Sequence, residues 1–258
     1  MRTTAIMNLK GGVAKTITAV NMAAILAEKH GKRVLLIDAD HQGNSSSFFH
    51  PEDGSTTITD ILTDNCEAYW AESVQESGWE GLDFLPADMR LAELDLEDVD
   101  KQERDRRHYR LREFLEAAAE DDAYDHAIID MPPGFSAAAR AALIAADEVI
   151  IPMKLDAFSA DGMIAMIRQI DSIRKLNEKL RFLGVLVTMR RGKSTEAGIR
   201  ALRESKIPVF KQSIRWTSEI VDESTHEHEP LHIYSPRCGA ARDYIKFVAE
   251  YLGVKKNA

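Results

Sequence analysis

The stretch that decides the fold is Met7–Thr16, "MNLKGGVAKT". It follows a short apolar segment, residues 3–8, and precedes an amphipathic segment, residues 15–30, so it predicts a strand, a glycine-rich turn and a helix. In such a turn several backbone N–H groups converge with the positive end of the helix, a geometry that suits phosphate oxygens. Gly11 and Gly12 allow close backbone approach, because a Cβ would collide with the phosphates. The stretch therefore predicts a phosphate-binding loop.

The loop nevertheless departs from the common phosphate-loop pattern. G-x-x-x-x-G-K-[ST] requires glycine where this chain has Leu9 and Ala14. Lys15 and Thr16 still end the pattern, and they are expected to reach the β- and γ-phosphates and to bind Mg²⁺. A second lysine, Lys10, stands before the glycine pair and has no role in the common pattern. From these residues alone, the site is either an impaired nucleotide site or a different kind of site in which Lys10 has its own task.

Apolar segments alternate with amphipathic segments along most of the chain. Such alternation is typical of βαβ units, so we expect an α/β fold: an open, mostly parallel sheet covered by helices on both faces, as in Rossmann-like P-loop NTPases. Continuous apolar runs such as "VLLI" and "AII" indicate strands that are buried on both faces. Beyond the loop, strands are expected within residues 33–40, 124–134, 146–153, 182–189 and 207–214, and helices over 15–30, 159–176 and 240–252.

The region from residue 52 to residue 125 has a different character. It is acidic, and its strand signals are few apart from "LDFLPA", residues 82–87. It predicts a helical insertion and connection within the same domain. We find neither internal repeats nor a Pro/Gly/Ser-rich linker, so residues 1–258 are expected to form a single domain.

Composition excludes several classes of protein. The hydrophobic fraction is 45%, with no apolar run near the roughly 18 residues of a membrane span. No signal-peptide h-region precedes the glycines. Cys66 and Cys238 lie far apart without a partner motif, so neither a disulfide framework nor a zinc site is expected, and a reducing cytoplasm fits best.

Charge is distributed unevenly. The net charge is −9, yet the segment Arg168–Arg215 holds 13 Lys and Arg against 4 Asp and Glu. A positive segment inside an acidic protein predicts a polyanion-binding face. Ordinary solvated helix faces would give the same count, so charge alone leaves both interpretations open.

Four motifs resemble those of one protein family. "KGGVAKT", Lys10–Thr16, fits the signature K-G-G-x-x-K-[ST] of the ParA/MinD (deviant Walker A) superfamily of ATPases. "LLIDADHQGN", Leu35–Asn44, resembles the ParA motif D-x-D-P-Q-G-N with His41 in place of proline, and "AIIDMPPG", residues 127–134, resembles the family's Walker B strand. The segment Pro230–Leu252 resembles the ParA C-terminal pattern and favours the ParA/Soj partitioning branch.

The resemblance implies ATP and Mg²⁺ as cofactors. The implied nucleotide contacts are Lys10, Gly11, Gly12, Val13, Ala14, Lys15, Thr16 and Ile17 in and after the loop, with Thr188 and Met189 beside the base. Mg²⁺ would be held by Thr16 and, through water, by Asp130, with Asp40 as a second candidate through water. Glycine is the usual family residue at Ala14, so Ala14 is expected to tune affinity or rate.

The resemblance also implies catalytic roles. Lys10 would cross a dimer interface to the phosphates of the partner's nucleotide, and Lys15 would neutralise phosphoryl charge in its own subunit. Asp40 would position or activate the attacking water, whereas Asp38 would orient the loop and the lysines. Positioning and charge neutralisation are the main requirements of phosphoryl transfer.

For function, the resemblance implies an ATPase that forms a homodimer with ATP, binds DNA non-specifically and drives plasmid or chromosome partitioning. A ParB-like centromere-binding protein would stimulate hydrolysis, and the protein would be cytoplasmic and nucleoid-associated. Phosphate contacts are sequence-blind and depend on salt. The expected DNA-binding residues are Arg190, Arg191, Lys193, Lys211 and Arg215.

Two other functions compete with this one. The terminal helix, residues 240–252, could be a MinD-like membrane helix, although its docking on the core and no stable membrane association are expected. A nucleotide-gated binding module that barely hydrolyses because of Ala14 is the non-enzyme alternative. His226, His228 and His232 stand near acids, but they fall where ParA proteins have a surface turn, which is favoured over a metal site.

Overall fold

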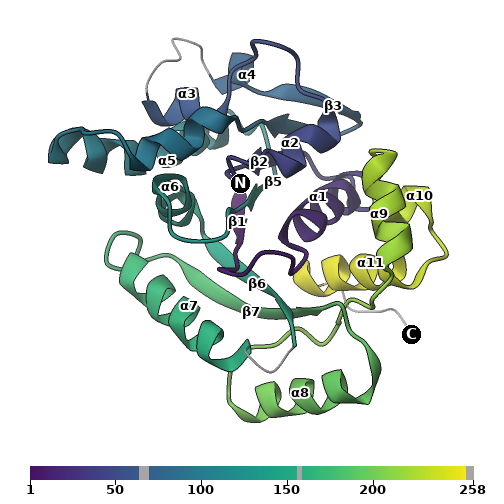
Figure 1. Ribbon diagram of the computed structural model, residues 1–258. Helices are drawn as coiled ribbons and strands as arrows, with labels where there is room; N and C mark the ends of the chain where they lie inside the picture. Colours follow the sequence, from purple (N-terminus) through teal and green to yellow (C-terminus); the bar gives the residue numbers. More distant parts are fainter. Residues whose placement is uncertain (64–69, 156–158, 254–258) are drawn as a thin grey trace.

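A seven-stranded sheet forms the centre of the protein in the computed structural model, which describes residues 1–63, 70–155 and 159–253 (Figure 1). The strand order is β3-β4-β2-β5-β1-β6-β7, and every pair is parallel except β3 with β4. The strands are β1 (Arg2–Ile6), β2 (Val34–Asp38), β3 (Gln75–Trp79), β4 (Leu82–Leu85), β5 (His126–Asp130), β6 (Glu148–Lys154) and β7 (Arg181–Thr188). The predicted α/β class and parallel sheet are confirmed.

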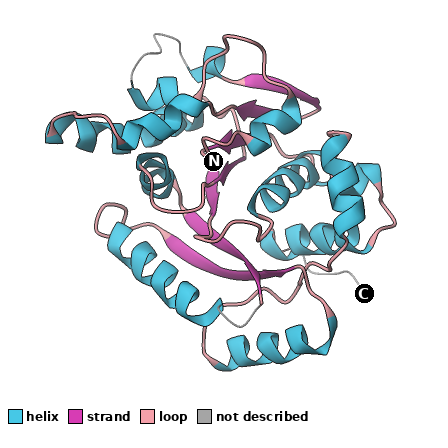
Figure 2. Ribbon diagram, viewed as in Figure 1, coloured by secondary structure: helices cyan, strands magenta, loops and turns pink. Residues whose placement is uncertain are grey.

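Helices cover both faces of this sheet (Figure 2). One apolar cluster packs strand residues against α1 (Lys15–His30), α2 (Asn44–Phe49), α9 (Ser218–His226), α10 (Leu231–Tyr234) and α11 (Gly239–Tyr251). The other packs the opposite strand residues against α3 (Ile58–Thr63), α4 (Trp70–Ser73), the 3₁₀ helix η1 (Met89–Asp95), α5 (Lys101–Glu120), α6 (Ala137–Ala145), α7 (Ser159–Ile173) and α8 (Gly192–Glu204). Strands buried on both faces explain the continuous apolar runs of the sequence.

Strand register gathers the polar motifs at one edge of the sheet. Asp130 at the end of β5 lies level with Asp38 at the end of β2, and also with Ile6 at the end of β1. Lys154 at the end of β6 lies level with Thr188 at the end of β7. The phosphate loop and the aspartates therefore share the carboxyl edge, where open α/β sheets bind ligands.

Helix α1 has the bounds that the sequence predicts. Gly31 ends it in the left-handed conformation, with φ 59°, and its N–H donates to the carbonyl of Ala27. At the other end Ala14 precedes the helix with φ 67°, also left-handed. Alanine adopts this conformation at a cost, whereas glycine does so freely.

The prediction of a last strand over residues 207–214 is wrong. This segment runs parallel to β7 but contacts it only at isolated bridges, among them Val185 with Val209. Pro208 has no N–H to donate to a ladder. The N–H groups of Lys211 and Gln212 donate instead to Glu250 of α11, at 2.7 and 2.9 Å. The segment is therefore held both by these helix side chains and by a few backbone hydrogen bonds to β7, among them the N–H of Phe210 to the carbonyl of Val185 at 3.0 Å.

The acidic insertion contains more sheet than the sequence predicts. Strand β4 confirms the signal at "LDFLPA", but β3 was not expected. Strand β3 lies at the edge of the sheet and is only partly buried, and Gly78 and Glu76 interrupt any apolar pattern. Edge strands with such residues give weak sequence signals.

The apolar side of α11 docks on the core, as expected. Tyr244 and Phe247 are buried, and the Tyr244 hydroxyl lies 3.0 Å from the Thr18 hydroxyl of α1. A similar contact joins Tyr251 to Thr4 of β1 at 2.8 Å. Within the described ranges, we find no helix that is long and apolar enough to cross a membrane.

Ala14→Gly is predicted to stabilise the fold. Glycine relieves the left-handed strain at φ 67°, which costs alanine roughly 1–2 kcal/mol, less the entropy that glycine gains in the unfolded chain. We expect a Tm increase of about 1–3 °C by calorimetry. Gly31→Ala is the matched control, because a Cβ there would meet no atom within 4 Å and only backbone strain is added; its Tm should fall. A lower Tm for Ala14→Gly would contradict the prediction.

Candidate nucleotide-binding site

The phosphate loop connects β1 to α1 and crosses the centre of the view in Figure 1. Asn8 fixes its start: the side-chain amide donates to the carbonyl of Pro152 at 2.6 Å, and Oδ1 accepts the N–H of Lys10 at 2.9 Å. The Thr188 hydroxyl fixes its middle by donating to the carbonyl of Val13 at 3.0 Å. The ends of β6 and β7 therefore hold the loop in place, and Asn8 is a positioning residue that sequence reasoning missed.

Lys15 is buried at the base of the loop, with a relative exposure of 7%. Its ammonium donates to the carbonyl of Lys10 at 3.3 Å. Burial lowers the pKa of Lys15, and the carboxyl groups of Asp130 and Asp40 oppose that shift. A buried lysine with one weak carbonyl contact and two nearby acids is poised to bind an anion. Lys10 itself lies nearer the surface and is partly exposed.

Asp130 has a strongly perturbed carboxyl group. It is 1% exposed, and neither oxygen has a hydrogen-bond partner among the described residues. Burial, followed by the charge of Asp38, raises the pKa of Asp130 to about 8, although Lys15 acts in the opposite direction. Buried polar atoms are nearly always satisfied, so these two oxygens indicate a ligand-binding position.

Asp38 is buried beside Asp130, and both of its carboxylate oxygens accept hydrogen bonds. It accepts the N–H and the hydroxyl of Ser46 at 2.8 and 2.7 Å, and the N–H of Asp40 at 3.0 Å. Burial raises the pKa of Asp38 despite these bonds. Asp38 therefore orients Asp40 and the start of α2, whereas the sequence suggested that it orients the loop and lysines.

Asp40 reaches the same group of charges. It is buried, and its Oδ1 accepts the N–H of Gln42 at 3.1 Å. His41, which replaces the proline of the ParA motif, places its Nδ1 3.6 Å from the same oxygen. Asp40 is thus held by its own turn at a position where its charge acts on both Lys15 and Asp130.

The donors in this group fit Mg²⁺. Asp130 offers two unpartnered oxygens, and the Thr16 hydroxyl lies close enough to act on its pKa. Mg²⁺ prefers such hard oxygen donors and keeps several waters or phosphate oxygens as its remaining ligands. Within the described part of the chain, no three His, Cys, Asp or Glu side chains are arranged to hold a metal by themselves.

The histidines of "THEHEPLH" form separate contacts. The ring of His228 packs on His50 at a centroid distance of 3.9 Å, and His232 contacts Glu28 at 2.6 Å. His226 ends α9 and is exposed. Cys238 is buried and caps α11 through the N–H of Ala241, while Cys66 lies outside the described residues.

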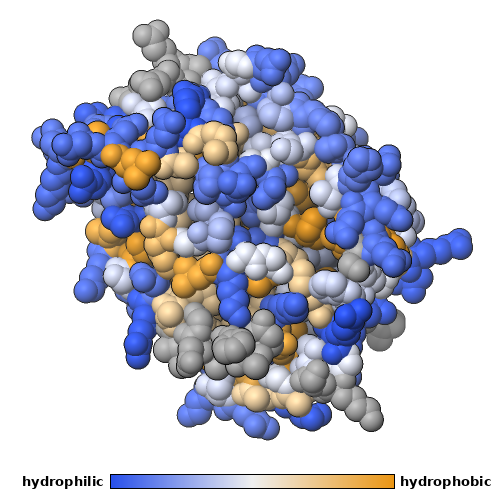
Figure 3. Space-filling view, in the orientation of Figure 1, coloured by the Kyte–Doolittle hydropathy of each residue, from blue (hydrophilic) through white to orange (hydrophobic). Residues whose placement is uncertain are grey.

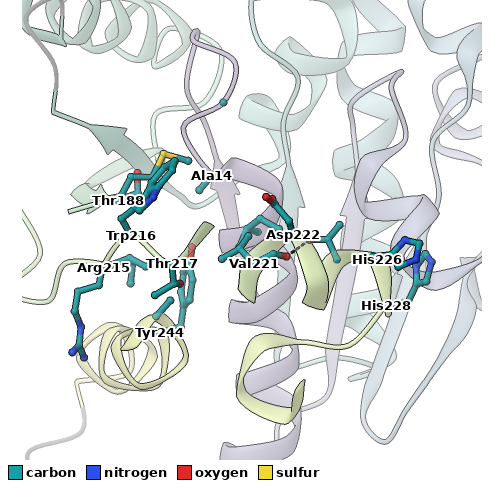
Figure 4. A pocket seen from close by; sticks show the side chains of 16 residues that line it. Ala14, Thr188, Arg215, Trp216, Thr217, Val221, Asp222, His226, His228 and Tyr244 are labelled. Carbon is teal, nitrogen blue, oxygen red and sulfur yellow. Dashed lines mark hydrogen bonds between the residues drawn. The ribbon is translucent and has the colours of Figure 1, made fainter. Parts of the chain in front are cut away.

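A cavity of about 610 Å³ opens beside the loop (Figure 4). Thr188 and Met189 line it, as the resemblance implies for a base pocket, together with Gly12, Ala14 and Ile17 of the loop and α1. Several further residues line it that sequence reasoning missed. They are Ile214, Arg215, Trp216, Thr217, Val221, Asp222, Thr225, His226, His228, Ala240 and Tyr244. They come from residues 214–217, from α9 and the turn after it, and from α11, and no motif of the sequence assigned them to a base pocket.

The five expected DNA-binding residues divide into two groups. Arg215 is exposed but paired: its guanidinium donates to both oxygens of Asp243, at 2.7 and 2.9 Å. It therefore fixes its segment to α11 and is a poor candidate for a DNA contact. Arg191 and Lys211 are exposed, and Arg190 is partly exposed. Lys193 lies in the first turn of α8, but its side chain lies outside the description.

Comparisons with known proteins agree with this geometry. A family model described as "AAA domain" matches residues 1–182. The chromosome partitioning protein ParA of Caulobacter vibrioides is 34% identical over 100% of this chain and 96% of its own length. The sporulation initiation inhibitor protein Soj of Bacillus subtilis is 35% identical over 95% of this chain and 96% of its own.

A solved structure gives the same fold. Cobyrinic acid a,c-diamide synthase from Mycobacterium smegmatis, with bound ADP and magnesium, has a TM-score of 0.80 and 26% identity, covering 97% of this chain and 94% of that chain. Full-length relatives above 30% identity and the signature loop, held at the carboxyl edge of a parallel sheet, lead to one conclusion. The chain belongs to the ParA/Soj family of chromosome-partitioning ATPases, within the ParA/MinD superfamily.

Proposed function

We propose that the protein is an ATP-dependent dimerising ATPase that binds DNA non-specifically and drives plasmid or chromosome partitioning, with hydrolysis stimulated by a ParB-like partner. It would act in the cytoplasm, on the nucleoid. The observation that carries the proposal is the group formed by buried Lys15, the rim lysine Lys10 and the unpartnered carboxyl group of Asp130. Similarity to ParA along the whole chain supports the partitioning role.

ATP and Mg²⁺ would occupy this group together. The loop N–H groups and Lys15 would bind the phosphates, and Thr16 would hold Mg²⁺ directly, with Asp130 bound through water. The metal would supply charge neutralisation at the phosphoryl oxygens. Asp40 would position the attacking water, since its turn holds it beside Lys15 and Asp130.

A second subunit would complete the site. Lys10 is partly exposed at the rim, and its carbonyl already accepts Lys15 of the same chain. Apolar residues gather between α6 and α7 on the face shown in Figure 3, which also bears the loop, and hydrophilic residues surround them. An apolar surface beside a nucleotide site suits burial in a dimer. Lys10 would then reach the partner's phosphates.

DNA would bind to the basic residues near the end of β7. Arg190 and Arg191 follow the strand directly, and Lys211 is exposed on the neighbouring segment. Dimerisation would place two such surfaces on one particle and double the number of phosphate contacts. Glu219 at the start of α9 is acidic and exposed, so we place α9 outside the DNA surface.

A second candidate is a nucleotide-gated binding module that hydrolyses little. Ala14 favours it, because a left-handed alanine places a Cβ in a loop where the family uses glycine. Turnover of the unaltered protein with DNA and its partner decides between the two functions.

Lys10→Ala is predicted to separate ATP binding from dimerisation. The variant should still bind ATP through Lys15 and the loop amides, but it should remain monomeric with ATP by light scattering, because the partner's phosphates lose their second cation. Lys101→Ala on α5 is the control for removing one exposed lysine, and it should dimerise normally. Dimerisation of Lys10→Ala at the concentration that suffices for the unaltered protein would exclude the role in the partner site.

Asp40→Ala is predicted to bind ATP but to hydrolyse it slowly. Loss of a group that positions water commonly costs on the order of 10²-fold or more in rate. Phosphate release at saturating ATP measures the effect, and Asp40→Asn keeps the side-chain volume as a control for packing. Turnover of both variants at the unaltered rate would refute the assignment of Asp40.

A further inference from the structure

Trp216 lies where the nucleotide cavity meets the basic surface. It lines the cavity next to Thr188, on the opposite side from Asp222 and His226 (Figure 4). Two cations lie near its ring: the Cζ atom of Arg191 is 5.4 Å from the ring centroid, and the Nζ atom of Lys154 is 5.9 Å away. Both distances are within the range of a cation–π attraction.

The backbone around Trp216 is fixed from two sides. The N–H of Arg190 donates to the carbonyl of Ile214 at 2.8 Å, and the N–H of Trp216 donates to the carbonyl of Arg190 at 3.2 Å. The next residue back, Arg215, is held to α11 by Asp243. The cavity wall and the basic residues therefore belong to the same two hydrogen-bonded segments. Trp216 lines the cavity and also contacts the basic residues.

The strength of such contacts depends on water. A cation over an aromatic ring is attracted weakly in water and more strongly where water is excluded. Arg191 is exposed and Trp216 is only partly buried, so the attraction in the nucleotide-free protein is weak. A base that enters the cavity would remove water from the tryptophan and strengthen its hold on the two cations.

We propose that Trp216 is a positioning residue that couples the cavity to DNA: when a nucleotide base fills the cavity, the ring holds Arg191 and Lys154 in place for DNA phosphates. The inference rests on the proposed function, because it requires ATP-dependent DNA binding. The proposal adds Lys154 to the DNA surface. It also assigns the nucleotide base, and not the phosphates alone, a role in controlling DNA affinity.

The first test follows the ring itself. The chain contains three tryptophans, at positions 70, 79 and 216. In a Trp70→Phe, Trp79→Phe variant, only Trp216 emits. Its fluorescence should change on addition of Mg-ADP, and Arg191→Ala in the same background should alter the size of that change. If the double variant folds poorly, the difference between the unaltered protein and Trp216→Phe gives the same signal. Trp216 fluorescence that is unchanged both by Mg-ADP and by Arg191→Ala would overturn the proposal.

The second test is a double-mutant cycle on DNA affinity, measured by fluorescence anisotropy with saturating ATP. Trp216→Leu and Arg191→Ala should each weaken binding, by roughly 3- to 10-fold for contacts of this kind. The two together should weaken binding by less than the product of the separate effects, because the tryptophan acts in part through the arginine. Lys211→Ala is the matched control: it removes an exposed cation other than the two that lie over the Trp216 ring, so its effect should multiply with that of Trp216→Leu.

The outcomes separate this inference from the proposed function. Multiplicative effects of Trp216→Leu and Arg191→Ala, in a protein that binds DNA with ATP, would overturn the coupling and leave the DNA function intact. Absence of ATP-dependent DNA binding by the unaltered protein would overturn the proposed function, and the coupling with it. A role of Trp216 in ATP binding alone would move the ATP affinity but leave the cycle multiplicative, which also contradicts the proposal.

Discussion

Burial and the neighbouring Asp38 hold the carboxyl group of Asp130 protonated near neutral pH by raising its pKa to about 8. The parallel register places this group at the end of a central strand, level with Asp38, and its two oxygens have no partner among the described residues. Taken alone, such a group makes folding less favourable as pH rises from about 4 to about 8, because the folded state keeps a proton that the unfolded state releases. A divalent cation would displace that proton and remove the cost.

Lys15 is the buried base of the site, as Asp130 is its buried acid. Burial lowers the pKa of Lys15, and its ammonium donates to the carbonyl of Lys10 at 3.3 Å. Phosphate oxygens and a metal would satisfy both groups together, which explains why an acid with a raised pKa and a base with a lowered pKa lie side by side here. The ligand-free site is thus incomplete in charge, and ligand binding is expected to stabilise the fold by mass action.

Much of this was predictable from local sequence, since the strands around the site are continuous apolar runs and α1 has a glycine stop. The Lys10, Lys15, Asp38, Asp40 and Asp130 group follows from motifs at strand ends, which a parallel sheet must bring together. The wall of the cavity beside the loop was not predictable. It is built in part by a segment that looks like a strand but pairs with β7 only at isolated points, and Asp243 and Glu250 of α11 accept hydrogen bonds from its N–H groups and guanidinium. Pairing between side chains and backbone across such distances leaves no periodic signal, and the same reason hides the internal role of Arg215.

We propose that nucleotide state controls DNA binding through a charge-incomplete site that ATP completes. DNA affinity of the unaltered protein, measured by anisotropy on unrelated duplexes across a salt series, with Mg-ATP, with Mg-ADP and without nucleotide, tests this proposal. We expect binding that needs ATP, that is equal for all duplexes, and that falls with salt by ~0.9 in log K per phosphate neutralised. Equal affinity in all three nucleotide states would contradict it.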